Sequence, residues 1–225
     1  MTTSMTRPTI AETCKRVETV GIVPVVRAAT PELAERAAAA VLAGGISIFE
    51  ITMTVPNAPA VIRSLVARFG DRAVVGAGTV LSADDARLCI EAGAAFIVSP
   101  GLDVPTIAAA HERGVPIMPG ALTPTEVITA WKAGADMVKI FPASAVGGAK
   151  YLKALRGPLP QVKLLPTGGV NATTAGDYIA AGACALGVGS ELVDPAALAA
   201  GNDGILTERA RELVAAVAAA RAKLS

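Results

Sequence analysis

Short apolar runs alternate with alanine-rich segments along the whole chain. The runs are rich in Val, Ile and Phe and suit buried strands, whereas the segments between them open with helix-capping residues and close at glycine. The expected strands are 22–28, 47–54, 73–80, 96–101, 115–122, the run around Lys139, 162–169 and 184–190. Strands that alternate with helices pair in parallel through right-handed crossovers, and about eight such units close into a barrel. We therefore predict an α/β fold of the (β/α)8 TIM-barrel type.

Local signals place the helices between these strands. Thr30 precedes Pro31, which is an N-cap followed by proline at the first helical position. Asn171 is expected to cap the helix after the seventh strand. An extra N-terminal helix at about 9–20 precedes the first strand, and an amphipathic helix at 207–224 ends the chain.

The repeat is not interrupted by a change of composition or by a linker rich in Ser and Pro, so we expect one domain over 1–225. A chain of this length is ordinary for a single-domain barrel. An open, doubly wound sheet is the structural alternative. The Gly-x-Gly-x-x-Gly fingerprint is absent after the first strand, which weakens a dinucleotide-binding hypothesis.

The overall charge excludes some classes of partner. The chain carries 20 Lys and Arg against 19 Asp and Glu, a net charge of +1, and aromatic residues make up 3%. Without a basic surplus or stacking platforms, no nucleic-acid partner is expected. No apolar run reaches the roughly 18 residues that a membrane span needs, and the first eight residues do not resemble a secretion signal. We therefore expect no membrane association and a cytoplasmic location.

The sequence offers no ligand set for a metal. Cys14, Cys89 and Cys184 are scattered without a Cys-x-x-Cys pair and are expected to be core thiols. His111 is the only histidine, which excludes a histidine-rich metal site.

The stretch 136–143 sets a lysine in the middle of an apolar strand. Pro142 cannot donate to a sheet ladder, so the strand should end there and leave Lys139 near its C-terminal end. A buried ammonium is costly unless it is paired or has lost its proton, and a desolvated neutral amine is a nucleophile toward ketones. A structural lysine paired with a buried carboxylate would explain this stretch equally well.

Other polar residues fall at the same level of the predicted barrel, where the C-terminal ends of the strands share one mouth. Glu50 interrupts the second apolar strand, and the period of two turns it inward. It is a candidate general base, or the ion-pair partner of Lys139 or of Arg27 at the end of strand one. Thr79 ends strand three and suits a hydrogen bond to a substrate carboxylate, although a local backbone bond would also explain it.

Glycines end the last two predicted strands. Gly168 and Gly169 end strand seven, and Gly187, Gly189 and Ser190 end strand eight, each just before a helix. Glycines let backbone N–H groups approach an anion, and barrel enzymes often hold a phosphate after strands seven and eight. Tight turns that need a positive φ are the alternative explanation.

Six motifs resemble those of the 2-keto-3-deoxy-6-phosphogluconate (2-dehydro-3-deoxy-6-phosphogluconate, KDPG) aldolases. They lie at 45–56, 76–80 (Gly-Ala-Gly-Thr-Val), 97–100, 118–120, 138–142 (Val-Lys-Ile-Phe-Pro) and 166–170 (Pro-Thr-Gly-Gly-Val). The resemblance as a whole covers nearly the entire chain. The resemblance implies a metal-free class I aldolase of carbohydrate metabolism, in the Entner-Doudoroff pathway. Such enzymes form a lysine Schiff base without a cofactor, assemble as homotrimers, and give pyruvate and D-glyceraldehyde 3-phosphate. Members often also cleave 4-hydroxy-2-oxoglutarate.

The resemblance also implies roles for single residues. Lys139 would form the Schiff base, and Glu50 would accept and return protons. Arg27, Thr79 and Pro100 would lie around the pyruvate part, with Phe141 packing near it. Gly168, Gly169 and Ser190 would bind the phosphate, with Thr167 beside them. Some members have an arginine where this chain has Thr54, and there it helps to bind the substrate carboxylate. Arg27 is the candidate for that task here.

Three other functions stay open at this point. A 2-dehydro-3-deoxy-6-phosphogalactonate aldolase is the main rival among close relatives. A phosphate-barrel isomerase or epimerase would share the Gly168 and Gly169 site without forming an imine. A catalytically silent barrel that serves as an assembly subunit would need neither Lys139 nor Glu50.

Overall fold

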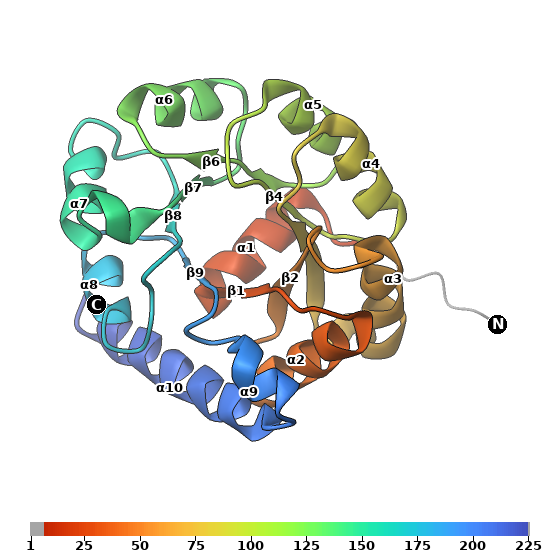
Figure 1. Cartoon of the computed structure of the whole chain (residues 1–225). Coiled ribbons are helices and arrows are strands. Elements are labelled where there is room, and N and C mark those ends of the chain that lie inside the picture. Colours follow the sequence, from red (N-terminus) through yellow and green to blue (C-terminus); the bar gives the residue numbers. More distant parts are fainter. Residues whose placement is uncertain (1–6, 225) are drawn as a thin grey trace.

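The computed structural model describes residues 7–224, and in it a ring of strands is surrounded by helices (Figure 1). The strands are β1 (Ile22–Val26), β2 (Ile48–Thr52), β3 (Val74–Gly78), β4 (Ile97–Val98), β5 (Ile117–Met118), β6 (Gly120–Ala121), β7 (Val138–Ile140), β8 (Leu164–Pro166) and β9 (Leu186–Val188). They form one sheet in the order β5-β4-β3-β2-β1-β9 and another in the order β6-β7-β8, and the pairings in both are parallel.

The two sheets make one barrel. β5 and β6 are consecutive and are separated only by Pro119, and a parallel bridge between Thr167 and Gly187 joins the end of β8 to β9. With β5 and β6 counted as one, the nine strands of the described chain give a ring of eight. The predicted TIM barrel is therefore confirmed, and the open doubly wound sheet is excluded.

Helices cover the outside of the ring. They are α2 (Pro31–Ala43), α3 (Ala58–Phe69), α4 (Ala83–Glu91), α5 (Val104–Glu112), α6 (Pro124–Lys132), α7 (Ala149–Arg156), α8 (Ala175–Ala180), α9 (Pro195–Ala199) and α10 (Asp203–Ala222), with 3-10 turns η1 (Gly70–Arg72) and η2 (Ala143–Val146). The predicted cap of α2 is present, because the Thr30 hydroxyl accepts a hydrogen bond from Leu33 N at 3.3 Å. No helix within residues 7–224 combines the length and the apolar character that a membrane span needs.

Alternation along the strands creates two apolar layers. On β2, Phe49 and Ile51 pack into the layer between the strands and the helices, whereas Ile48 packs inside the ring with Phe96. Glu50 lies on the same side of β2 as Ile48, because side chains along a strand alternate between its two faces. The prediction that Glu50 points inward is confirmed.

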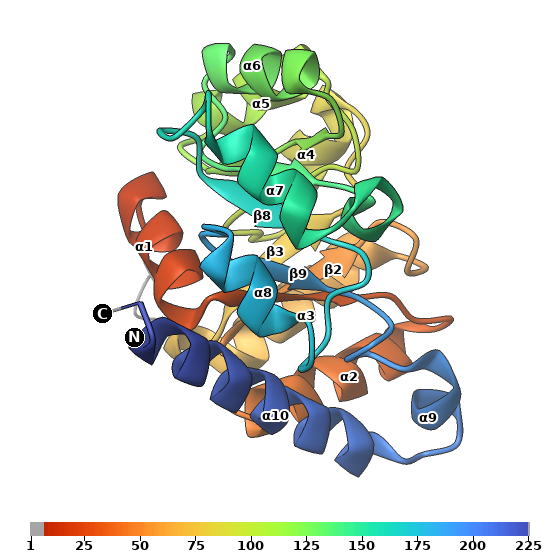
Figure 2. The same cartoon turned by 90° about the vertical axis from the view of Figure 1, so that its left-hand side faces the viewer.

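Helix α1 (Ile10–Val20) covers one end of the barrel (Figure 2). Gly21 leads directly from α1 into β1. Arg16 Nη2 donates to Ser47 Oγ at 2.8 Å just before β2, and Lys163 Nζ lies 2.5 Å from Glu18 Oε1 just before β8. Helix α1 therefore covers the N-terminal ends of the strands, which we call the closed end. The C-terminal ends form the open mouth.

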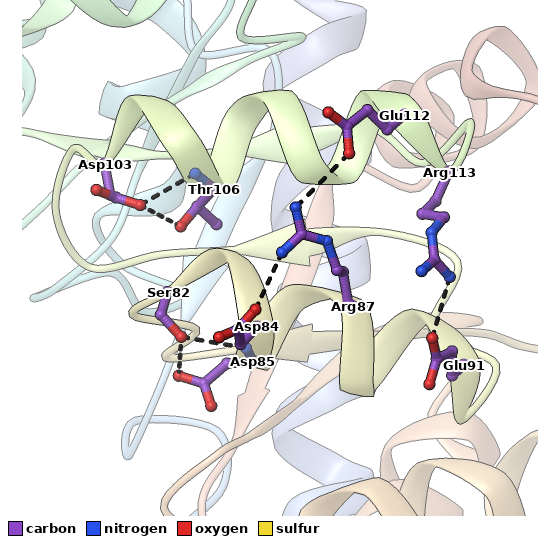
Figure 3. Close-up of polar contacts among 9 residues, drawn as sticks. All are labelled: Ser82, Asp84, Asp85, Arg87, Glu91, Asp103, Thr106, Glu112 and Arg113. Atoms are coloured by element: carbon purple, nitrogen blue, oxygen red, sulfur yellow. Dashed lines mark hydrogen bonds and ion pairs between the residues drawn. The ribbon is translucent and has the colours of Figure 1, made fainter.

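Polar contacts fix the position of outer helices α4 and α5 (Figure 3). Ser82 and Asp103 accept hydrogen bonds from backbone N–H groups in the first turns of α4 and α5. The Arg87 guanidinium lies 3.0 Å from Asp84 Oδ1 and 3.7 Å from Glu112 Oε2, so it links the two helices. Exposed pairs of this kind stabilise a fold by at most about 1 kcal/mol each, so they contribute more to the relative orientation of α4 and α5 than to the stability of the fold.

Two predicted helix starts are wrong. Asn171 does not cap α8, because the N-cap of that helix is Thr174. The Asn171 side chain instead accepts hydrogen bonds from Thr173 N and Thr174 N, both at 3.0 Å, and closes the turn before the helix. The C-terminal helix begins at Asp203 rather than at 207. Thr207 lies inside the first turns, where its hydroxyl donates to Ala40 O at 3.0 Å and so anchors α10 to α2.

Candidate active site

The candidate residues gather at the open mouth. Glu50 lies on β2 and Lys139 on β7, and the others follow strand ends: Arg27 after β1, Thr79 after β3, Pro100 after β4, Phe141 after β7, Thr167, Gly168 and Gly169 after β8, and Ser190 after β9. A cavity of about 1010 Å³ lies at the closed end, between α1 and the start of β3. None of the candidate residues lines it.

Lys139 is almost fully enclosed in the barrel. Its residue is 5% exposed, and its register neighbours are Gly120 on β6 and Leu165 on β8. Its Nζ lies 5.2 Å from the centroid of the Phe141 ring. No carboxylate among residues 7–224 forms a salt bridge with it. The structural alternative, a lysine held by a direct ion pair, is therefore excluded for the described residues.

Glu50 is a buried carboxyl group without a direct partner. Its residue is 1% exposed, and its Oε1 has no hydrogen-bond partner in the described chain. Burial raises the pKa of this carboxyl group, while the positive charges of Lys139 and Arg27 act in the opposite direction. A carboxyl group that is near two cations but bonded to neither can exchange protons with a bound molecule or with water.

Arg27 is the exposed cation of the mouth. Its guanidinium makes no hydrogen bond and no salt bridge to any of residues 7–224. The hydroxyl of Thr54 is already engaged: its oxygen lies 2.7 Å from Thr52 Oγ1, and Thr52 uses its proton on Val26 O at 3.2 Å. Arg27 is therefore better placed than Thr54 to bind a carboxylate.

Thr79 has an unusual backbone. Its φ is 56°, in the left-handed region that a β-branched residue adopts only under constraint. Its side chain makes no hydrogen bond within the described residues, so the local backbone bond that would explain it structurally is not present. Strained residues of this kind cluster at binding sites, which agrees with a role at the mouth.

Pro100 packs on the strand next to Lys139, and Phe141 follows the strand that carries Lys139. A Cβ on Gly120, the register neighbour of Lys139, would collide with the backbone of Pro100, so Pro100 packs directly on this strand. Phe141 is 38% exposed and is among the most exposed large apolar side chains of the described chain. An exposed ring beside a buried lysine provides an apolar wall for a small ligand.

The glycines after β8 combine a tight turn with free N–H groups. Gly168 and Gly169 have φ values of 97° and 71°, so the turn explanation holds for both. Ala143 N donates to Thr167 O at 2.9 Å and Ser144 N to Gly168 O at 3.3 Å, so η2 occupies the carbonyls. The N–H groups of Gly169 and Ser190 donate no hydrogen bond within residues 7–224. They remain available for an anion.

Thr167 carries a second buried polar atom at the mouth. Its residue is 5% exposed, and its Oγ1 has no partner among the described residues. The hydroxyl packs over Gly187, where any Cβ would collide with it. The glycine of β9 therefore makes room for Thr167 at the point where β8 and β9 meet.

A small cavity beside Gly169 was not predicted from the sequence. It measures about 290 Å³ and is lined in part by Ser144, Gly148 and Tyr178. Gly148 is the N-cap of α7, with φ of 61°. The signal in the sequence is the Gly147–Gly148 pair, which resembles the glycines that follow β8 and lie in and after β9.

The expected core thiols are partly confirmed. Cys14 and Cys89 are buried and Cys184 is partly exposed, and burial raises the thiol pKa of Cys14 to about 11 and of the other two to about 12. Within residues 7–224, no three His, Cys, Asp or Glu side chains are grouped so that they could hold a metal ion.

Comparisons with known proteins agree with this arrangement. The family model for KDPG and KHG aldolase matches residues 12–207. A KHG/KDPG aldolase of Escherichia coli (strain K12) is 40% identical over 193 residues, which is 86% of this chain and 90% of the relative. A 2-dehydro-3-deoxy-6-phosphogalactonate aldolase of the same organism is 36% identical over 76% of this chain and 83% of its own length.

Solved structures give the same result. The crystal structure of KDPG aldolase from Legionella pneumophila, with pyruvate captured as a covalent carbinolamine intermediate, has a TM-score of 0.82 and 32% identity, and the match covers 89% of this chain and 97% of that one. The chain therefore belongs to the KDPG and KHG aldolase family.

Proposed function

We propose that this protein is a class I aldolase that cleaves KDPG to pyruvate and D-glyceraldehyde 3-phosphate through a Schiff base at Lys139. The observation that carries the proposal is a pair of groups at the mouth: a buried lysine, and a buried carboxyl group, Glu50, that is bonded to neither Lys139 nor Arg27. The names of the relatives support this substrate and the reaction type, which is carbon–carbon lyase chemistry.

In the proposed mechanism, the neutral amine of Lys139 attacks the C2 carbonyl of the substrate and forms a carbinolamine. Glu50 donates the proton with which water leaves, and the protonated imine that results draws electrons from C3. Glu50 accepts the proton of the C4 hydroxyl as the C3–C4 bond breaks and the aldehyde leaves. The enamine of pyruvate then takes a proton at C3 from Glu50, and water hydrolyses the imine and frees Lys139. No cofactor takes part.

The substrate carboxylate is assigned to Arg27 and Thr79, with Pro100 and Phe141 as the walls of the pyruvate site. Arg27 supports this assignment because it has no competing partner among the described residues, and a guanidinium matches the geometry of a carboxylate. Some relatives use an arginine at the position of Thr54. Here the Thr54 hydroxyl donates to Thr52, so Arg27 provides the positive charge for the substrate carboxylate.

The phosphate is assigned to Gly168, Gly169 and Ser190, with Thr167 beside them. Free N–H groups on Gly169 and Ser190 and the unpartnered Thr167 hydroxyl support this position. Cleavage of 4-hydroxy-2-oxoglutarate, which has no phosphate, would use the Lys139 end of the site alone.

A second candidate is 2-dehydro-3-deoxy-6-phosphogalactonate aldolase activity, which differs only in the configuration at C4. The observation that favours it is the relative of that name at 36% identity. An isomerase or epimerase without an imine would leave the burial of Lys139 unexplained.

We also propose, on the family resemblance, a single barrel domain over 1–225, a homotrimer and a cytoplasmic location, with no metal requirement. Analytical ultracentrifugation tests the assembly. EDTA should leave turnover unchanged, and loss of activity that zinc or magnesium restores would contradict the metal-free mechanism.

Trapping is the test of the proposed function. Incubation with pyruvate and borohydride should add one pyruvate-derived mass to the protein, and peptide mapping should place it on Lys139. Lys163, a lysine at the closed end, is the internal control and should stay unmodified. Absence of a stable adduct on Lys139 would exclude the Schiff base and leave the non-imine alternatives.

A further inference from the structure

The inner face of β3 carries no side chain beyond Val74, at the start of the strand. Along Val74–Gly78, Val75 and Ala77 pack into the outer layer with the helices, so Gly76 and Gly78 face the interior of the barrel. Two neighbouring side chains use the space that β3 leaves: the Phe96 ring lies over Gly76, and the Glu50 carboxyl group lies over Gly78.

Glu50 does not lie over its own register partner. The pairing of β2 with β3 sets Glu50 opposite Gly76 and Thr52 opposite Gly78. The carboxyl group nevertheless lies against Gly78, two residues nearer the C-terminal end of β3. The side chain therefore leans along the barrel toward the mouth, where Lys139 and the substrate site are.

Phe96 occupies the other place that the Glu50 carboxyl group could take, nearer the closed end. Its ring is 0% exposed, and a Cβ at Gly76 would lie 2.5 Å from Phe96 Cε1 and Cε2, so the ring fills the space over Gly76. Glu50 cannot lean toward the closed end because this ring occupies the interior there. The space over Gly78 is where its carboxyl group is accommodated.

We propose that Gly78 is a positioning residue for the Glu50 carboxyl group, which turns toward the mouth only because β3 has no side chain at that point. A Cβ at Gly78 would lie 2.5 Å from Glu50 Cδ, whereas ordinary contacts begin at 3.4 Å, so the carboxyl group would have to move by about 1 Å. The inference rests on the proposed function, because it presupposes that Glu50 moves protons.

The variant Gly78→Ala tests this. The φ of Gly78 lies outside the left-handed region, so alanine is compatible with the backbone, and the group it meets is the mobile end of a side chain. We expect the rate of deuterium exchange into the methyl group of pyruvate to fall by roughly 10- to 100-fold. Borohydride trapping at Lys139 should still go to completion, because the lysine has not moved.

Gly101→Ala is the matched control. Gly101 follows β4 at the same mouth, and an added Cβ there has nothing within 4 Å. This variant should trap pyruvate and exchange deuterium at the wild-type rate. If Gly78→Ala behaves like Gly101→Ala in both assays, the inference is wrong.

A double-mutant cycle separates positioning from a structural role. Gly78→Ala should lower the melting temperature when Glu50 is present, and this decrease should disappear in the Glu50→Ala background, where the space is empty. An equal decrease in both backgrounds would overturn the proposal. Should Gly78→Ala alone not fold, folding of the double variant would support it, and failure of both would refute it.

Failure of the role of Gly78 and failure of the proposed function would give different outcomes. Loss of the adduct in the wild-type protein would remove the aldolase assignment. Normal exchange in Glu50→Gln would remove Glu50 from the chemistry. Impaired exchange in Glu50→Gln together with normal exchange in Gly78→Ala would refute the role of Gly78 alone.

Discussion

The two ends of the barrel treat polar groups in opposite ways. At the closed end they are paired: Arg16 with Ser47, Lys163 with Glu18, and His111 Nε2 with Asp136 Oδ2 at 2.8 Å. At the mouth, Glu50 Oε1 and Thr167 Oγ1 are buried and have no partner in the described chain, and Lys139 and Arg27 have no ion pair.

This difference indicates where stability has been given up for function. An unsatisfied buried polar atom costs roughly 1–3 kcal/mol, so a fold keeps such atoms where a ligand will satisfy them. Thr13 Oγ1 on α1 is the exception at the closed end. It is a single hydroxyl, whereas the mouth brings an amine, a carboxyl group and a guanidinium together.

The largest expected effect comes from removing the amine at the mouth. Lys139→Ala should lower turnover at least about 1000-fold, because no other group can form the imine. Lys163→Ala, the matched change at the closed end, removes a partly exposed ion pair and should leave turnover within about twofold of wild type. Steady-state kinetics with a coupled pyruvate assay measures both. Activity of Lys139→Ala within about tenfold of wild type would rule out the Schiff base.

The next effect concerns the carboxyl group. Glu50→Gln keeps the size of the side chain but cannot shuttle protons, so deuterium exchange into pyruvate should fall by about 100- to 10,000-fold. Imine formation should continue slowly, and borohydride trapping followed by mass spectrometry shows it. Unchanged exchange would mean that another group, or water alone, carries the proton.

The alternation of apolar residues was enough to predict the barrel and the inward direction of Glu50. It was not enough for α9, whose five residues are shorter than two helical turns and leave no periodicity to detect. It also misplaced the start of α8, because Asn171 makes its cap-like hydrogen bonds to a turn instead of a helix. Local capping chemistry looks the same in both settings.

For the candidate site, the resemblance supplied residue types and their order along the chain. The absence of a direct Glu50–Lys139 ion pair could not be predicted, since it depends on how far each side chain reaches across the barrel. Nor could the left-handed backbone of Thr79, because a β-branched residue is a poor candidate for that conformation.

A smaller effect is expected at the phosphate end. Contacts to a phosphate contribute about 1.5–3 kcal/mol each, so Gly168→Ala should lower kcat/KM for KDPG by roughly 10- to 100-fold. Cleavage of 4-hydroxy-2-oxoglutarate should fall much less. Gly168 has φ of 97°, so alanine also brings backbone strain of about 1–2 kcal/mol.

A glycine at the closed end isolates that strain. Gly114 has φ of 67° and nothing within 4 Å of an added Cβ, so Gly114→Ala should lower the melting temperature without changing the ratio of kcat/KM between the two substrates. Equal losses on both substrates in Gly168→Ala would show that the glycine pair is a supporting turn and that the phosphate binds elsewhere.

The smallest expected effect is thermodynamic and has opposite signs at the two ends. Burial raises the native pKa of Glu50 above its ordinary value of 4.5, so the native state keeps this proton to higher pH than the unfolded chain does. The associated stability is present below pH 4.5 and is lost as pH rises through the native pKa. Glu50→Gln should therefore melt a few degrees higher than wild type at pH 8, and this gain should vanish near pH 4.

Glu12 on α1 provides the contrast. Hydrogen bonds from Thr9 N and Thr9 Oγ1, both at 2.8 Å, lower the pKa of this exposed carboxylate. Its stabilising contribution is present above pH 4.5 and is lost as pH falls through the native pKa, so Glu12→Gln should lower the melting temperature at pH 8 and have no effect at strongly acidic pH. Calorimetric scans of both variants from strongly acidic pH to pH 8 measure the two differences. If both variants change the melting temperature in the same direction at pH 8, the ionised Glu50 carboxylate does not destabilise the native state. Glu50 would then be stabilised as Glu12 is.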